Sequence, residues 1–137
     1  MNEEVAPQSE NEHLKLLIVD DEKHVRDGLK ELGTSLGFNV FAAEDGINGC
    51  DLFKKVEPNL VIMDIYMPRM NGLLAMKKMK EMNPDCPIVL ITGFMHYEQL
   101  VNQRGIKPDG FILKPFHLKS IADVMLKMVE ENLDAVN

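Results

Sequence analysis

Five polar residues, each at the end of a short apolar run, form the pattern in this sequence that could carry chemistry: Asp20, Asp21, Asp64, Thr92 and Lys114. If the apolar runs are parallel strands of one sheet, their carboxyl ends lie at one edge, where open α/β sheets bind ligands. Polar residues are also common where strands leave a core, so any one of the five alone would mean little. Together, at matching strand ends, they predict one site.

The chemistry predicted for this set is phosphoryl transfer. Two like charges about 4 Å apart repel by roughly 4 kcal/mol at an effective dielectric near 20, so three clustered carboxylates need more cation than one lysine supplies. Mg²⁺ suits such oxygen ligands. A lysine and a hydroxyl can contact phosphoryl oxygens while a carboxylate acts as nucleophile. Asp64 stands alone between the acidic pair and the Thr92–Lys114 side, which favours it as the nucleophile.

The elements that must position these residues are predicted from apolar periodicity. Strands are expected at residues 14–20, 38–43, 59–64, 87–92 and 110–114, and helices at 23–36, 45–56, 71–82, 96–104 and 117–133. The strand starts lie 24, 21, 28 and 23 residues apart, which is too long for hairpins and suits one helix between strands. We therefore expect an α/β fold, a doubly wound parallel sheet of five strands with five helices.

Composition narrows the class of protein. The 137 residues suit one domain, which we place at residues 13–137, after an acidic flexible tail over residues 1–12. The net charge is −7, which argues against a nucleic-acid surface on this chain. The apolar runs are too short for a membrane span, and no signal peptide is recognisable. Cys50 and Cys86 follow no pattern and are read as reduced thiols of a cytoplasmic protein.

The residues around the five strand ends resemble the receiver domain of two-component response regulators, of the chemotaxis-regulator type. The matching segments are the acidic pair after "LLIV", "MDIYMPRMNG" around Asp64, Thr92 after "IVLI", and "LKPF" with Lys114 and Pro115. The resemblance covers about residues 14–134. It implies a flavodoxin-like sheet with the strand order 2-1-3-4-5.

The resemblance also implies a role for each matching residue. Asp64 would accept a phosphoryl group from a histidine kinase or a phosphotransfer protein, and Lys114 and Thr92 would contact the phosphoryl oxygens. Phe111, at the aromatic switch position, would move with Thr92, and the peptide bond before Pro115 would be cis. The Mg²⁺ ligands would be Asp20, Asp21, Asp64 and the backbone carbonyl of Tyr66.

The sequence has bulky residues at two positions where the family varies, and it departs from the family pattern in one segment. Tyr66 and Phe94, two positions after Asp64 and Thr92, are bulky and would limit the access of water to the phosphoryl group. The segment "RGIKPD" at residues 104–109 replaces the small residues usual there, so the fourth helix is expected to end early. Because Tyr66 and Phe94 would limit this access, we expect slow self-dephosphorylation.

We expect a signalling switch and not a metabolic enzyme, with catalysis limited to its own phosphorylation and dephosphorylation. Two other functions are alternatives to this interpretation. A haloacid-dehalogenase-type phosphatase would carry D-x-D on its first strand, where this chain has adjacent aspartates. A degenerate receiver would serve only as a binding platform.

The sequence leaves the output of such a switch open. The effector would be a downstream partner protein or an output domain missing from this chain, and homodimerisation is left open. Neither nucleic acid nor a membrane is an expected partner of this chain.

Overall fold

Five parallel strands form one sheet in the order β2-β1-β3-β4-β5, the order that the resemblance implied. The strands are β1 Lys15–Val19, β2 Asn39–Ala43, β3 Leu60–Asp64, β4 Ile88–Thr92 and β5 Gly110–Leu113. This computed structural model describes residues 14–93 and 107–136, with side chains up to residue 130. The predicted acidic tail at residues 1–12 lies outside the described residues.

The described residues form four helices: α1 Lys23–Ser35, α2 Gly46–Val56, α3 Gly72–Met82 and α5 Leu118–Val136. The helix predicted over 96–104 lies outside the described residues. Three of the predicted starts, at residues 45, 71 and 117, were one residue early; at the first two, Asp45 and Asn71 cap the helices instead of joining them. Their side chains accept hydrogen bonds from Asn48 N at 2.8 Å and Leu74 N at 2.9 Å. In the part of the chain described, no helix is long and apolar enough to span a membrane.

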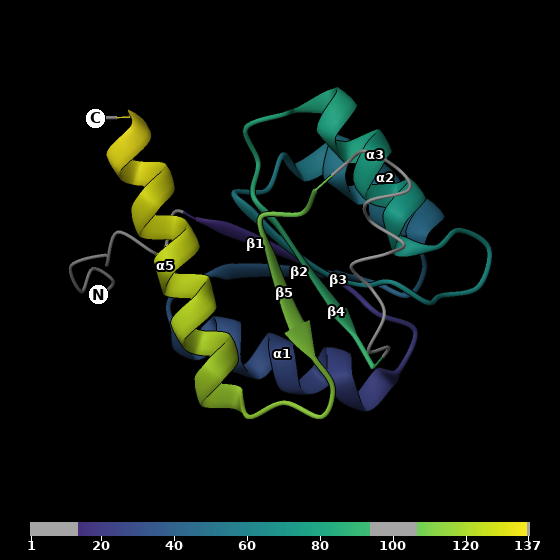
Figure 1. The fold of residues 1–137 in the computed structure, drawn as a ribbon, viewed down its shortest axis with the longest axis horizontal. Coiled ribbons are helices and arrows are strands. Elements are labelled where there is room, and N and C mark those ends of the chain that lie inside the picture. The colour runs from purple at the N-terminus through teal and green to yellow at the C-terminus, as the bar shows by residue number, and fades with distance from the viewer. Residues whose placement is uncertain (1–13, 94–106, 137) are drawn as a thin grey trace, which may run out of the picture.

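Helices cover both faces of the sheet, with α1 and α5 on one side and α2 and α3 on the other (Figure 1). Successive strand residues alternate between these two cores. Leu17, Val61 and Met63 belong to the α2–α3 core, whereas Leu16, Ile18 and Ile62 belong to the α1–α5 core. Because both faces are covered, β3 and β4 are buried along their whole length, which explains their uninterrupted apolar sequence.

Helix α2 shows why a glycine-rich segment can still be helical. Its buried residues are Gly46, Gly49 and Phe53, whereas Ile47 and Cys50 are only partly buried. A Cβ on Gly49 would lie 3.0 Å from the side chain of Val19 on β1. The glycines let α2 approach the sheet closely, and this packing offsets their poor helix propensity.

Both cysteines are free thiols in the described structure. Cys86 is buried, and this burial raises the pKa of its thiol to about 12. Cys50 is partly buried, and burial raises its pKa as well. Both groups are therefore protonated near neutral pH and act as small apolar fillers.

Candidate functional site

The five predicted residues do meet at the carboxyl edge of the sheet. Asp20 follows the last residue of β1, Asp64 ends β3 and Thr92 ends β4. The register pairs Thr92 with Leu113, the last residue of β5, so Lys114 comes directly after β5 at the edge where Thr92 ends β4. The backbone N–H of Lys114 donates to the Thr92 carbonyl at 2.8 Å. Rigid strands therefore hold each side chain at the same edge.

Three carboxylates form a tight anionic cluster. Oxygens of Asp20, Asp21 and Asp64 all lie within 4.8 Å of one another; the first and third residues are buried and Asp21 is exposed. Burial, together with the charge of Asp20, raises the pKa of Asp64 to about 6 although Lys114 opposes the rise. Burial likewise raises the pKa of Asp20, against the hydrogen bond that it accepts from Glu22 N. This under-neutralised set of oxygen donors fits a hard divalent cation.

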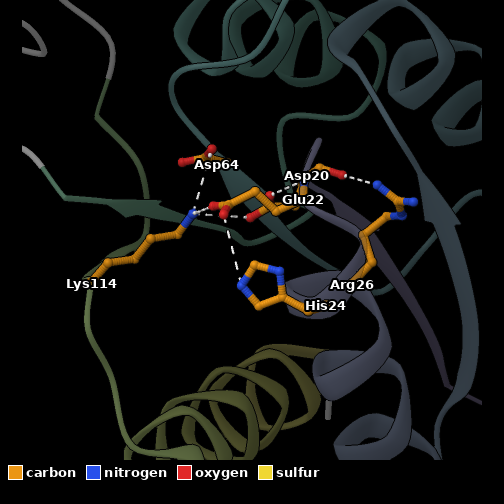
Figure 2. A network of polar contacts seen from close by, with 6 residues as sticks. All are labelled: Asp20, Glu22, His24, Arg26, Asp64 and Lys114. Atoms are coloured by element: carbon orange, nitrogen blue, oxygen red, sulfur yellow. Dashed lines mark hydrogen bonds and ion pairs between the residues drawn. The ribbon is translucent and has the colours of Figure 1, made fainter.

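Lys114, which directly follows β5, contacts two of the three clustered carboxylates. Its Nζ lies 3.4 Å from Asp20 Oδ2, 3.7 Å from Asp64 Oδ2 and 3.1 Å from Glu22 Oε1 (Figure 2). Burial disfavours the charge on this lysine, but the hydrogen bond to Glu22 and the nearby aspartates outweigh it and raise its pKa. The ammonium is therefore charged over the whole neutral range.

Two residues of this network were missed by the sequence predictions. Glu22 directly follows the acidic pair and meets Lys114, and its place in the run "DDE" was the one available signal. Arg26, one turn into α1, donates from Nη1 to the backbone carbonyl of Asp20 at 2.8 Å. The hydrogen bond with Lys114 lowers the pKa of Glu22. Lys114 thus faces one more carboxylate than the pattern indicated.

A glycine shapes the loop between β3 and α3. A Cβ on Gly72 would collide with the backbone carbonyl of Asp64, and the Gly72 N–H donates to Ile65 O at 2.6 Å. In the same loop Arg69 adopts a left-handed backbone with φ of 71°. Its Nη1 donates to Oδ2 of buried Asp45 at 2.9 Å, which ties the loop to the start of α2.

The structure places the remaining predicted residues as follows. Thr92 is fully buried, and Phe111 on β5 packs, partly buried, against the α2–α3 core. Tyr66 is 46% exposed beside the site, while Phe94 lies outside the described residues. The Lys114–Pro115 peptide bond is cis, the conformation that the resemblance implied.

Comparison with known proteins gives one consistent answer. The family described as response regulator receiver domain matches residues 16–126. The chain is 34% identical over 107 residues to the regulatory protein AtoC of Escherichia coli (strain K12), covering 78% of this chain and 23% of that protein. It is 28% identical over 113 residues to sporulation initiation phosphotransferase F of Bacillus subtilis (strain 168), covering 82% and 91%.

Solved structures agree on the fold. A CheY-like response regulator receiver domain protein from Methanospirillum hungatei JF-1 superposes with a TM-score of 0.83 at 24% identity, covering 89% of this chain and 98% of that one. At this identity the likeness shows the fold alone. The chain spans 23%, 44% and 47% of the length of the first three relatives, so it corresponds to one part of those larger proteins.

Proposed function

The chain belongs to the response regulator receiver domain family, and we propose that it is a phosphorylation-activated receiver of a two-component phosphorelay. The phosphoryl group would come from a histidine kinase or a phosphotransfer protein and would be accepted on Asp64. The observation that supports this most is the end of β3: a buried carboxylate, held by a rigid strand, with Asp20, Asp21 and Lys114 around it.

In the proposed reaction a carboxylate oxygen of Asp64 attacks the phosphorus, so that the O–P bond forms as the bond to the donor breaks. Lys114, whose Nζ lies 3.7 Å from Asp64 Oδ2, stabilises the charge on the phosphoryl oxygens. Receiver domains bind Mg²⁺ at an acidic pocket, and here Asp20, Asp21, Asp64 and the Tyr66 carbonyl would hold it. When bound, the cation neutralises the carboxylates and phosphoryl oxygens.

The phosphorylated domain would then signal through Thr92 and Phe111. The phosphoryl group adds negative charge and acceptor oxygens beside the end of β4, where the Thr92 hydroxyl can donate to it. Movement of Thr92 would make room for the ring of Phe111, which lies across from Leu90 on the neighbouring strand. The domain would thus shift between two arrangements of its β4–β5 surface.

The lifetime of the signal would depend on how water reaches the phosphoryl group. Self-dephosphorylation needs a water in line with the O–P bond, and Tyr66 lies two residues beyond Asp64. The two bulky residues identified in the sequence, Tyr66 and Phe94, would shield the group and offer no carboxylate or amide to orient a water. We therefore propose limited self-phosphorylation and slow loss of the phosphoryl group.

The proposed setting is a cytoplasmic signalling pathway. The phosphodonor would approach the carboxyl edge of the sheet, and the signal would pass to a downstream partner protein or to an output domain. A second copy of the chain is another candidate partner. Neither nucleic acid nor a membrane is proposed as a partner of the described surface, on account of the net negative charge.

The test is incubation with acetyl phosphate, with and without Mg²⁺, read by intact mass. We expect one phosphoryl group on the wild type with Mg²⁺ and none on Asp64→Asn. A chain that gains no phosphoryl group would act as a binding platform, and one that turns over excess phosphodonor catalytically would be a phosphatase. Equal labelling of the Asp64→Asn variant would contradict the assigned nucleophile.

A further inference from the structure

The shortest ion pair of Lys114 is with a residue outside the five that the family pattern assigns. Its Nζ lies 3.1 Å from Glu22 Oε1, against 3.4 Å to Asp20 Oδ2 and 3.7 Å to Asp64 Oδ2 (Figure 2). The first two contacts satisfy hydrogen-bond geometry. The ammonium proposed to serve the phosphoryl group therefore lies nearer to Glu22, just before α1, than to the nucleophile.

The position of Glu22 is fixed by its backbone. Its N–H donates to Asp20 Oδ1 at 2.9 Å, and its carbonyl accepts from Arg26 N at 3.0 Å. Arg26 also donates from its guanidinium to the Asp20 carbonyl. The residue stands at the N-cap of α1, yet its side chain makes no capping hydrogen bond. The carboxylate is thus presented to Lys114 and has no part in starting the helix.

Glu22 differs from the three aspartates in what a bound cation would do to it. Asp20, Asp21 and Asp64 offer oxygens within 4.8 Å of one another and would share one cation, but Glu22 does not belong to that group. Neutralising the aspartates would weaken their hold on Lys114 and leave the charge of Glu22 in place. Glu22 would then remain the anion that opposes transfer of the ammonium to a phosphoryl group.

Resting on the proposed function, we infer that Glu22 is a positioning residue that holds Lys114 in the unphosphorylated state and competes with the phosphoryl group on Asp64 for its ammonium. A contact that is stronger in one state shifts the equilibrium toward that state. The carboxylate of Glu22 would also repel an incoming anionic phosphodonor. Both effects slow phosphorylation, and both disappear when the carboxylate becomes an amide.

The test compares Glu22→Gln with Glu44→Gln. Glu44 is an exposed carboxylate 3.4 Å from Nη2 of Arg26, so its amide variant removes one charge near the same edge without touching Lys114. His24 Nε2 lies 3.8 Å from the other Glu22 oxygen, so the wild type and both variants are compared at one fixed pH, near 8. Labelling with acetyl phosphate is followed by intact mass at Mg²⁺ concentrations where each rate has reached its plateau.

We expect Glu22→Gln to raise the rate constant of labelling about two- to fivefold, the range for loss of one partly exposed ion pair, and Glu44→Gln to leave it unchanged. A second readout, independent of phosphorylation, is NMR of ¹³C-labelled lysine in the metal-free protein. There the pKa of Lys114 should fall in Glu22→Gln and stay constant in Glu44→Gln.

The outcomes separate this inference from the proposed function. A labelled wild type with unchanged or slower labelling of Glu22→Gln would overturn the competition alone. An unchanged pKa of Lys114 in Glu22→Gln would overturn the hold on the lysine. If the wild type takes up no phosphoryl group, both the proposed function and the proposed competition are wrong. The NMR measurement still decides in that case whether Glu22 holds Lys114.

Discussion

The two edges of the sheet use charged side chains in opposite ways. At the amino edge, Lys80 Nζ on α3 contacts Asp109 Oδ2 at 2.8 Å and the Cys86 carbonyl at 2.7 Å. Asp109 also accepts the N–H of Ile88, the first residue of β4, at 2.7 Å. At the carboxyl edge, Lys114 contacts the carboxylates of Asp20, Glu22 and Asp64, and the carboxylate of Asp21 lies beside the two aspartates.

The balance of anions and cations distinguishes a charged contact that stabilises the fold from one that serves a reaction. At the amino edge one ammonium meets one carboxylate, and the same groups satisfy backbone atoms that would otherwise be unpaired. At the carboxyl edge the anions outnumber the cation, and burial raises the pKa of Asp64 to about 6. Such an imbalance lowers stability and is typical of a site that binds a cation or transfers a group.

The largest expected difference between the edges is in phosphorylation. Lys114→Met should lower the rate constant of labelling by acetyl phosphate about 10²- to 10³-fold, because it removes the ammonium that lies 3.7 Å from Asp64 Oδ2 and would stabilise the charge on the phosphoryl oxygens. Lys80→Met, the matched change at the amino edge, should leave the rate constant unchanged. Intact mass against time measures both. Equal rates for the two variants would show that the edges do not differ in this way.

The next effect is a gain of stability from removing a charge of the site. The pKa of Asp64 is raised from 3.8 to about 6, so the folded state binds this proton more tightly than the unfolded chain does. Stability is then lost as the pH rises from about 4 through about 6. In the presence of a chelator, Asp64→Asn should raise the free energy of unfolding by about 2–3 kcal/mol near pH 7 and by little near pH 4.

Urea unfolding at the two pH values measures this gain. Added Mg²⁺ should stabilise the wild type more than the asparagine variant, because the cation meets a full set of carboxylates there. An Asp64→Asn protein that is less stable than the wild type at neutral pH would contradict the account of this edge.

At the amino edge the same kind of change should have the opposite sign. Asp109→Ala should lower the free energy of unfolding by about 1–3 kcal/mol, because the buried N–H of Ile88 loses its acceptor. Asp109→Asn keeps an acceptor and loses the charge pair with Lys80, so its loss should be smaller, below about 1 kcal/mol. Equal losses in urea unfolding would show that the charge pair, and not the backbone acceptor, matters.

The smallest expected effect concerns the lifetime of the phosphoryl group. Tyr66→Asn removes a half-exposed ring beside the site and adds an amide that can orient a water. Loss of the phosphoryl group should therefore speed up about two- to fivefold, which corresponds to lowering the activation barrier by less than about 1 kcal/mol. Intact mass after removal of the phosphodonor follows the loss. Leu74→Asn, at an exposed apolar residue of α3, serves as the control. An unchanged lifetime in Tyr66→Asn would exclude shielding by this ring.

Much of the carboxyl edge was predictable from the sequence because it depends on local patterns. An uninterrupted apolar run predicts a strand covered on both faces, and its last residue must lie at the edge of the sheet, which placed Asp64 and Thr92 correctly. The alternation of strands and helices followed from the spacing of the apolar runs along the chain. The strand order came from the resemblance, and the β2-β1-β3-β4-β5 sheet agrees with it.

Other features were decided by the tertiary structure, because they join residues that no local pattern connects. Glu22 and Lys114 are 92 positions apart, and only the fold, which brings the residue before α1 next to the residue after β5, makes them neighbours. The ion pair of Arg69 with Asp45 and the burial of Gly49 against Val19 likewise depend on how closely α2 approaches the sheet. The sequence by itself determined which groups stand at the reactive edge, since strand periodicity is local. The tertiary structure decided which of them hold one another, since that depends on distances across the fold.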